Sequence, residues 1–449
     1  ALSIEDAVSF ALQENTALHI KEKGEDTARA ELKAARGKNS FSLSASGGFT
    51  ESRPDSGAHT RTGTASLSAS LPLYTGGANE AQIKSGELGL DAARLATERE
   101  RENLRYSVVK AYYDVLEAQR TVGISQETVD KYQAHLQNVE LLYQAGSKAR
   151  LDVLRSSVEL ANARQALIKA QNDCEVRFLT LKNLLRLPAE EPLTLTEDFS
   201  YRPFYSTMEA CVAYAVRNRK DILIDRYTLR QKELALAVAR AGYLPQVNLS
   251  ASAEADRDFQ PRSSESHHYS AGVRVSWAVF DGGVTAAAVD KAKTALAVAA
   301  LTLQQDMDDT DQAVRQAYYG MREAEKRLSA TQAAVGEARE DYAITMEKYR
   351  VGQGILLDVI DAQIALSTAE MNFASAKYDY ARNRAKVENE AGLSLGEAEE
   401  SIDPAAVEQG RIRQRTQEIV PSSDYQRAKA VVDGGRMAVN EADGNGGAR

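Results

Sequence analysis

The chain has 449 residues, of which 43% are hydrophobic, 27% charged and only 6% aromatic, a composition typical of long helices packed along narrow seams. The net charge of −9 disfavours a nucleic acid as partner, because proteins that bind nucleic acids present basic surfaces. The two cysteines, Cys174 and Cys211, lie far apart without the spacing of a metal or redox motif, so no metal site is predicted.

The N-terminal residue and the hydropathy bear on the location of the chain. The chain begins with Ala1 rather than Met, and we expect that a secretory signal peptide has already been removed. Because residue 1 is not Cys, no N-terminal lipid anchor is indicated. No run of 18 apolar residues occurs, so the sequence predicts no transmembrane helix. The strands of a membrane barrel give a much weaker signal and are not excluded.

The sequence carries an internal repeat with a constant offset. The segments "LPLYTGG" and "WAVFDGG" end at Gly77 and Gly283, which lie 206 positions apart. The same offset relates "LDVL" at 151–154 to "LDVI" at 357–360, and it relates the glycine before each of them, Gly146 and Gly352. Such order at one offset predicts a duplication, with repeats at 1–200 and 201–396 and a partly disordered C-terminal tail at 397–449.

Each half predicts the same order of elements. In the first half we expect a helix at about Ile4–Arg36, strands at about Phe41–Thr50 and Arg61–Leu73 in a hairpin over 41–74, and long helices within 78–187. In the second half we expect a helix at about Met208–Ala241, strands at about Val247–Ala255 and Tyr269–Phe280 in a hairpin over 246–281, and long helices within 284–392. The connector Leu187–Pro203 contains three prolines and predicts an extended linker.

The strands alternate apolar and polar residues, so each has one apolar and one polar face. A soluble sheet packed on the helices would satisfy this pattern, and so would a strand that faces lipid on one side. Four strands cannot close a barrel, and lipid tolerates no open sheet edge. A membrane barrel therefore needs several chains: two copies give 8 strands, and three give 12, which leave room for a lumen.

The long helices carry a heptad pattern. In the first of them, spacings of three and four alternate through Val122, Ser125, Val129, Tyr132, Leu136, Val139 and Tyr143. The pattern recurs over 328–349, and again through Ile360, Ile364, Ser367, Met371 and Ala374 toward Ala385. A sustained heptad predicts a left-handed coiled coil. A helix over about 78–145 spans about 100 Å, which far exceeds the thickness of a bilayer.

With these features in order, the sequence resembles the TolC family of bacterial outer-membrane channel proteins over about residues 1–395. The resemblance rests on the paired turns "YQAGSKARLDVL" and "YRVGQGILLDVI", the "YTGG" and "FDGG" junctions, the two "AYY" motifs and "GYLPQVNLSAS". It implies a mixed α and transmembrane β-barrel fold. Four strands per chain would form a 12-stranded trimeric barrel, continued by a long left-handed coiled-coil α-helical barrel.

The resemblance also implies a function and partners. A homotrimer in the outer membrane of a Gram-negative bacterium, with a large periplasmic part, would be a passive exit duct in contact with outer-membrane lipid. It would work with a periplasmic adaptor (membrane fusion) protein and an inner-membrane pump of RND, ABC or MFS type, in efflux of toxic compounds or in type I protein secretion. No cofactor and no enzymatic activity are implied. The alternative from the pattern alone is a soluble trimeric coiled-coil protein with a β-collar.

The resemblance places the site at the turns between the long helices. Gly146, Gly352, Gly354, Leu151 and Leu357 would lie at the periplasmic tip and contact the adaptor. Asp358 and Asp361 would line the closed aperture as rings of three carboxylates, with a solvated acid in a first helical turn as the alternative. Asp152 and Tyr349 are candidates for a tether between helices, with capping and core packing as the alternative.

Two departures from the family pattern and one expected motion complete the sequence analysis. Asn39-Ser40 stands where the second half has Leu244-Pro245, so the first strand junction is expected to differ. Gly354 occupies a position where some relatives carry a basic gate residue, which argues against an arginine lock there. We expect opening by untwisting of the helix pair at about Leu328–Ala385, because a seam of small residues can slide between packings.

Overall fold

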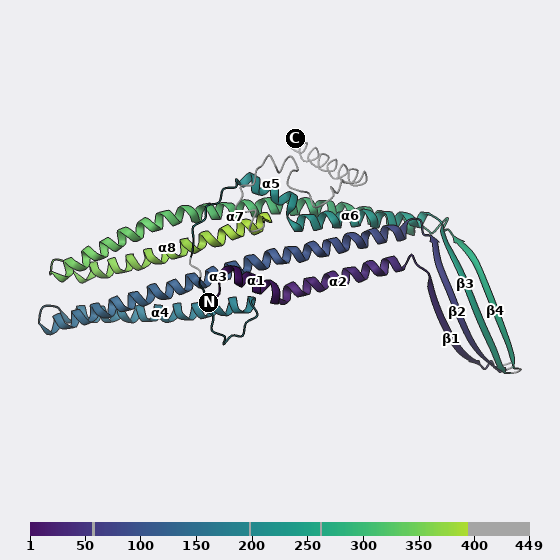
Figure 1. The fold of residues 1–449 in the computed structure, drawn as a ribbon, viewed down its shortest axis with the longest axis horizontal. Helices are drawn as coiled ribbons and strands as arrows, with labels where there is room; N and C mark the ends of the chain where they lie inside the picture. The colour runs from purple at the N-terminus through teal and green to yellow at the C-terminus, as the bar shows by residue number, and fades with distance from the viewer. Residues whose placement is uncertain (56–58, 197–198, 261–262, 394–449) are drawn as a thin grey trace, which may run out of the picture. The chain divides into compact units, whose positions relative to one another are not determined.

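The computed structural model describes residues 1–55, 59–196, 199–260 and 263–393, so the predicted tail at 397–449 lies outside the described residues. The first half forms α1 (Ile4–Glu14), α2 (Thr16–Gly37), β1 (Ser42–Ser52), β2 (Thr60–Tyr74), α3 (Ala78–Gln144) and α4 (Arg150–Leu184). The second half repeats this order with α5 (Met208–Asn218), α6 (Lys220–Arg240), β3 (Gln246–Gln260), β4 (Ser264–Ser276), α7 (Val284–Arg350) and α8 (Leu356–Ala391), as Figure 1 labels them.

The single helix predicted at the start of each half is wrong, because each is two helices. The backbone leaves the helical region at Asn15, where ψ is 124°, and the Asn15 side chain then accepts hydrogen bonds from the amides of Ala17 and Leu18. An asparagine at this place caps the second helix. The second half breaks in the same way at Arg219, where ψ is 131° and α5 gives way to α6. The apolar periodicity runs through both breaks and conceals them.

The four strands form one antiparallel sheet in the order β1-β2-β3-β4, so the hairpins of the two halves pair through β2 and β3. The observed strands have 11, 15, 15 and 13 residues, somewhat longer than predicted. The fourth ends at Ser276 rather than near Phe280. Ser276 pairs with Gln246, and the residue before Gln246 is Pro245, which has no amide hydrogen to extend the ladder.

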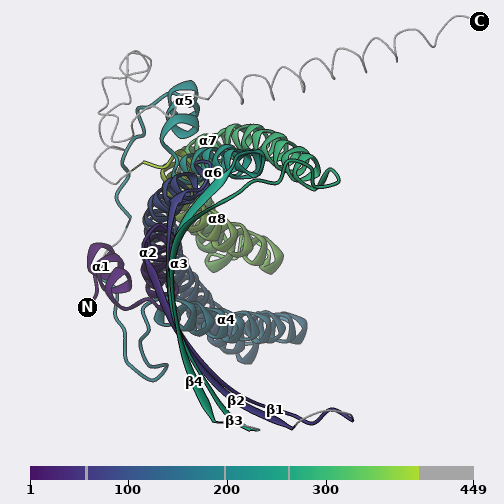
Figure 2. The same ribbon diagram turned by 90° about the vertical axis from the view of Figure 1, so that its right-hand side faces the viewer.

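The two faces of the sheet differ in chemistry along every strand. On one face the serines pair across strands, with Oγ–Oγ distances of 2.7 Å for Ser44–Ser68 and 2.8 Å for Ser252–Ser270. On the other face the register aligns apolar residues across all four strands, including the rows Ala45, Leu67, Ala253, Tyr269 and Leu43, Ala69, Ala251, Ala271. Figure 2 shows that the strands bend together into one curved sheet.

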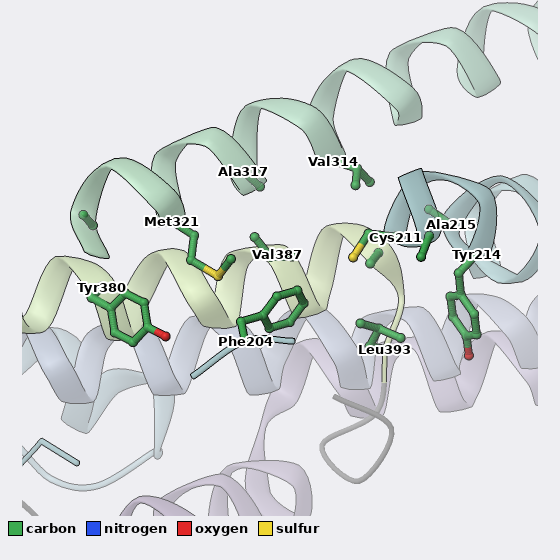
Figure 3. Packing of buried hydrophobic residues seen from close by; sticks show 13 residues of the cluster. Phe204, Cys211, Tyr214, Ala215, Val314, Ala317, Met321, Tyr380, Val387 and Leu393 are labelled. Atoms are coloured by element: carbon green, nitrogen blue, oxygen red, sulfur yellow. The ribbon is translucent and has the colours of Figure 1, made fainter. Parts of the chain in front are cut away.

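The described chain divides into two compact units, each of which draws on both halves of the sequence. The first unit comprises Ala1–Ile20, Glu98–Lys220 and, within the described part, residues 307–393. The second unit comprises Lys21–Thr97 and Asp221–Asp306, and it contains the sheet. Two of the hydrophobic cores in the first unit involve the short helices α1 and α5. One surrounds Tyr112 and Leu181, and Figure 3 shows the other, in which α5 packs on α7 and α8 through residues such as Cys211, Met321 and Val387.

The long helices pack through heptad contacts, but not always on the predicted face. The α3 seam is largely confirmed, since Val129, Tyr132 and Val139 are buried. In α8 the prediction is wrong for Ile364 and Met371, whose side chains are 50% and 36% exposed. The predicted Ile360 and Ala374 are buried, but between them the buried residues include Gln363, Leu366 and Glu370. Among the described helices, we find none with a stretch sufficiently long and apolar to cross a membrane.

One helix presents a second apolar seam that has no partner among the described residues. The buried seam of α4 contacts α3 through Leu160 and Ala163. A second heptad series on α4 is offset by two residues in sequence from this buried seam. Its residues are 47–66% exposed: Leu151, Leu154, Val158, Ile168 and Leu179. A coiled-coil helix with two seams has two neighbours, and α3 supplies only one of them.

Candidate functional site

The two turns that join the long helices have the same geometry. After α3, the amide of Gly146 donates to the Tyr143 carbonyl at 2.9 Å and the amide of Ser147 donates to the Leu142 carbonyl at 2.8 Å. After α7, Gly352 and Gln353 donate in the same way to Tyr349 and Lys348. Both patterns are Schellman motifs, which need a left-handed residue after the helix. Gly146 and Gly352 supply it with φ of 75° and 78°.

Gly354 serves a different purpose from Gly352. Its φ is not left-handed, but a Cβ at residue 354 would come within 3.1 Å of the Tyr349 backbone nitrogen. A glycine therefore lets the chain pass close to the last turn of α7. The offset of 206 pairs Gly354 with Lys148 of the first turn, so the basic side chain expected of a gate stands in the other turn. The Lys148 ammonium lies 4.2 Å from the centroid of the Tyr349 ring.

A small hydrophobic core lies beneath the turns. It consists of buried residues from α3, α7 and α8: Val139, Tyr349, Leu356, Val359 and Ile360. Tyr349 is 2% exposed, and its ring centroid lies 5.4 Å from that of His135, which is 6% exposed. Sequence analysis missed both His135 and Lys148, because neither lies on a heptad seam.

The predicted tether between Asp152 and Tyr349 forms no hydrogen bond in this structure. The Tyr349 hydroxyl is buried and has no hydrogen-bond partner among the described residues. Burial raises the pKa of Tyr349, and the negative charge of Asp152 raises it further. The two side chains therefore lie close enough to interact electrostatically, and the role of the pair as a gate stays a prediction.

Asp358 and Asp361 lie in the first turns of α8, and both are exposed. Neither carboxylate forms an ion pair with the described residues. Asp361 belongs to the exposed heptad series of α8, with Leu357, Ile364 and Met371. The charge of Asp361 also affects a residue of α3. Burial raises the pKa of Tyr132 to about 12, and the negative charges of Glu159 and Asp361 contribute to this increase. The two aspartates thus stand on a face that the single chain leaves open.

The turns also expose apolar side chains. Leu151 and Leu357, which directly precede Asp152 and Asp358, are 54% and 51% exposed. Val351 and Ile355 in the second turn are 58% and 60% exposed. Adjacent exposed apolar residues of this kind mark a surface that another protein covers. The contact with an adaptor that the sequence predicts for these residues is consistent with that exposure and remains a proposal.

Polar contacts between α3 and the α7–α8 pair weaken toward the turns. Far from the turns, Arg382 of α8 pairs with Asp114 of α3 at 2.8 Å and with Glu117 of α3 at 2.5 Å. Nearer to them, the Thr128 and Ser367 hydroxyls share a hydrogen bond at 3.0 Å. Near the turns, no ion pair joins α3 to α7 or α8 among the described residues, and ring contacts remain, of Lys131 with Tyr342 and of His135 with Tyr349. The pair is thus held by ion pairs at Arg382 and by ring and apolar contacts at its tip.

The described residues contain no group of three or more His, Cys, Asp or Glu side chains that could hold a metal ion. What the site offers is a set of exposed apolar side chains, exposed carboxylates and a weakly held contact between helices. These features suit association and movement.

Comparison with known proteins gives a consistent result. The model of the outer membrane efflux protein family matches residues 7–185 and 213–393. The chain is 24% identical to nodulation protein T of Rhizobium leguminosarum bv. trifolii, over 72% of this chain and 70% of that protein. It is 24% identical to the alkaline protease secretion protein AprF of Pseudomonas aeruginosa, over 78% and 76% of the two chains.

The fold is also that of a solved channel. The structure of CusC superposes with a TM-score of 0.77 at 19% sequence identity, covering 87% of this chain and 92% of that one. Since the family model matches most of the chain in two segments, the chain belongs to the outer membrane efflux protein family and is a passive exit channel of the Gram-negative outer membrane.

Proposed function

We propose that three copies of the chain close one 12-stranded barrel and one helical tunnel, which together form the exit duct. The observation that carries this proposal is the sheet of a single chain. Its apolar face is uncovered, with Leu43, Tyr269 and Val273 between 58% and 81% exposed, and β1 and β4 each pair on one side only among the described residues. Such a sheet becomes stable in lipid when its edges pair with those of other copies.

The exposed seams of the helices also support assembly with neighbouring copies of the chain. The exposed seams of α4 and α8 each need a helix beside them, and in a ring of identical subunits every copy supplies what the next one lacks. Members of this family are trimeric and work with an adaptor and an inner-membrane pump. We infer that the α4 seam is covered by the α7–α8 pair of a neighbouring copy.

Three-fold symmetry turns each exposed aspartate of α8 into a ring. We propose that Asp358 and Asp361 form two rings of three carboxylates at the tip of the tunnel. Rings of acids attract cations and raise an electrostatic barrier to anions. In this proposal, the tip is the narrowest part of the duct and its charge sets the ion selectivity.

The partners are inferred from the exposed residues at the turns, and the exported substrate is inferred from similarity to known proteins. We infer that the exposed residues at the turns, including Leu151 and Leu357, dock a periplasmic adaptor that links the duct to an inner-membrane pump of RND, ABC or MFS type. Export of small toxic compounds is the proposed use, in line with the family's description. Secretion of a protein is the second candidate, which the likeness to a protease secretion protein favours.

The assembly is tested by extraction and electrophoresis. We expect the chain in the outer-membrane fraction, solubilised only by detergent and migrating as a trimer on gels until heated. Extraction without detergent as a stable monomer would contradict the barrel. The gene neighbourhood tests the substrate, because a nearby pump favours efflux and a nearby repeat-rich secreted protein favours secretion.

The acidic rings are tested in planar bilayers with Asp358→Asn and Asp361→Asn. We expect each change to reduce selectivity for cations and to weaken block by divalent cations. The matched control is Asp173→Asn, which removes an exposed carboxylate from α4 at a distance from the turns. Unchanged ion selectivity in the double variant would contradict the ring assignment.

A further inference from the structure

The tip of the four long helices buries a histidine whose ring forms no hydrogen bond with the described residues. His135 on α3 is 6% exposed, and neither ring nitrogen has a hydrogen-bond partner among the described residues. The nearest ring is that of Tyr349 on α7, whose hydroxyl also has no partner there. A third buried group, the Ser156 hydroxyl on α4, has none either. Buried polar atoms without partners destabilise the packing that buries them.

The groups around His135 do not stabilise a positive charge on its ring. From the turn between α3 and α4 comes Lys148, whose ammonium lies 4.2 Å from the Tyr349 ring. From α7 come Tyr349 and Tyr342, with Lys131 of α3 over the Tyr342 ring at 5.3 Å.

Carboxylates do lie on the neighbouring helices, but the pKa values that they raise are those of tyrosines. Asp152 of α4 acts on Tyr349, while Glu159 of α4 and Asp361 of α8 act on Tyr132, nearly one turn before His135 on α3. No carboxylate among the described residues forms an ion pair or hydrogen bond with the His135 ring. Among the described residues, the charge that shifts the pKa of His135 is the repulsive one of Lys148.

We propose that His135 is a proton-sensitive contact between α3 and α7, which holds the tip closed while the imidazole is neutral and releases it when the imidazole is protonated. A buried cation with no counter-ion is far more costly than a buried neutral ring. The tip lowers that cost by separating α3 from α7, which hydrates the ring. The contact is placed for this role, because no ion pair among the described residues joins α3 to α7 or α8 at the tip, whereas Arg382 joins them far from it.

The direction of the pH effect follows from the same surroundings. Burial lowers the pKa of His135, and the charge of Lys148 lowers it further. Because this pKa lies below that of a hydrated histidine, the closed tip is fully stable above the ordinary value of about 6.5. Its stability relative to the open tip falls as the pH drops through the lowered pKa. Acid therefore opens the tip, and neutral pH closes it.

The first experiment follows the tip itself, since a link to transport rests on the proposal that the turns form the aperture. Hydrogen exchange is measured on the full-length protein in detergent, at pH 7.5 and 5.5, in peptides that cover the turn ends of α3 and α7. His135→Gln cannot be protonated and is compared with the native chain at each pH, so intrinsic exchange rates cancel. We expect the native tip to exchange at least about threefold faster than His135→Gln at pH 5.5, within the limit of about tenfold per pH unit for one proton.

Two further variants keep the test decisive if His135→Gln is poorly folded. Lys148→Met removes the repelling cation and brings the pKa of His135 closer to that of a hydrated histidine, so the acid-induced increase in exchange should become smaller; a larger increase would overturn the proposal. His19→Gln replaces an exposed histidine on α2 and should leave the response unchanged. A native tip whose exchange equals that of His135→Gln at both pH values also overturns it.

Conductance in planar bilayers separates this inference from the aperture proposal. If acid opens the native tip and raises conductance, with both effects lost in His135→Gln, both proposals are supported. If exchange responds to acid but conductance does not, the proton-sensitive contact stands and the aperture proposal fails. If neither responds, the inference about His135 fails.

Discussion

Replacing Arg382 tests how the α7–α8 pair is anchored. The guanidinium, 14% exposed, contacts Asp114 and Glu117 on α3 and Asp379 on its own helix. Arg382→Met keeps the length of the side chain and removes its charge. Asp114 then keeps Lys110, and Asp379 keeps Arg327, but Glu117 loses its cation.

The expected cost follows from these remaining partners. Removing one member of a buried ion pair costs about 3–5 kcal/mol when the other is left wholly unpaired. Because two of the three carboxylates retain a cation here, we expect about 2–3 kcal/mol. A loss of this size in local stability corresponds to roughly 30- to 150-fold faster hydrogen exchange in α8.

Arg384→Met provides a control matched in burial. The Arg384 side chain is also 14% exposed, but its carboxylate partner, Glu388, lies one turn on along the same helix at 3.1 Å. Such a pair contributes about 0.5 kcal/mol, and the hydrogen bond that Arg384 also donates to the Arg202 carbonyl at 3.1 Å contributes about 1 kcal/mol. Exchange of α8 in the trimer should therefore respond more strongly to Arg382→Met than to Arg384→Met. Equal responses would refute the argument that α8 is anchored by its contact with α3.

Three further predictions follow from individual residues. Gly352→Ala should destabilise by about 1 kcal/mol because of the left-handed backbone, while Gly336→Ala, on an open helical face, should stabilise by up to about 1 kcal/mol; thermal unfolding with the same sign for both would contradict this. Burial raises the pKa of Asp379, but the hydrogen bond and charge of Arg382 and the charge of Arg327 outweigh it, so the pKa is lowered from 3.8. Its stabilisation is therefore complete above that value and lost in stronger acid, and Asp379→Asn should flatten the acid limb of a stability-against-pH curve. Burial raises the pKa of Cys211 to about 11, and it is fully buried, whereas Cys174 is partly exposed; maleimide at pH 7 should label Cys174 in the native protein and reach Cys211 only after unfolding, and native labelling of both would disprove the buried position.

The repeat made much of the fold predictable from the sequence. One offset located the hairpins and the turns in both halves, since a conserved order of glycine and apolar landmarks needs a conserved order of elements. The predicted bounds of the first two strands lie within two residues of the observed ones, whereas the third strand extends five residues further and the fourth begins five residues earlier and ends four earlier than predicted. The break at Asn15 was not predicted, because a single capping residue does not disturb the apolar periodicity on either side of it.

The faces of the helices were harder to predict than the helices. A heptad pattern identifies an apolar seam but not the partner that covers it. Ile364 and Met371 lie on a seam that is exposed in the single chain, while Leu366 and Glu370 lie on the seam that is buried. A helix that contacts neighbours on two sides carries two overlapping patterns, and sequence alone does not rank them.

The candidate site was predicted at the turns, but its inner contacts were not. Gly146 and Gly352 follow from the Schellman pattern, which is local in sequence. His135 and Lys148 act on Tyr349 from the other half of the chain, and no periodicity within a helix encodes such a contact. The offset pairs Lys148 with Gly354, and this difference is one of those that distinguish the two turns in the sequence.

The pairing of β2 with β3 has a consequence for biogenesis. The Thr62 hydroxyl donates to Asp258 across 196 positions of the chain, so the two hairpins meet only after both intervening long helices have been synthesised. Closing so long a loop is slow, and until it closes each hairpin exposes a strand edge with unpaired backbone hydrogen-bonding groups. A polypeptide truncated in its second half is therefore left with an unpaired strand edge. In the complete chain, that edge has to be protected from aggregation until the last strand has been synthesised.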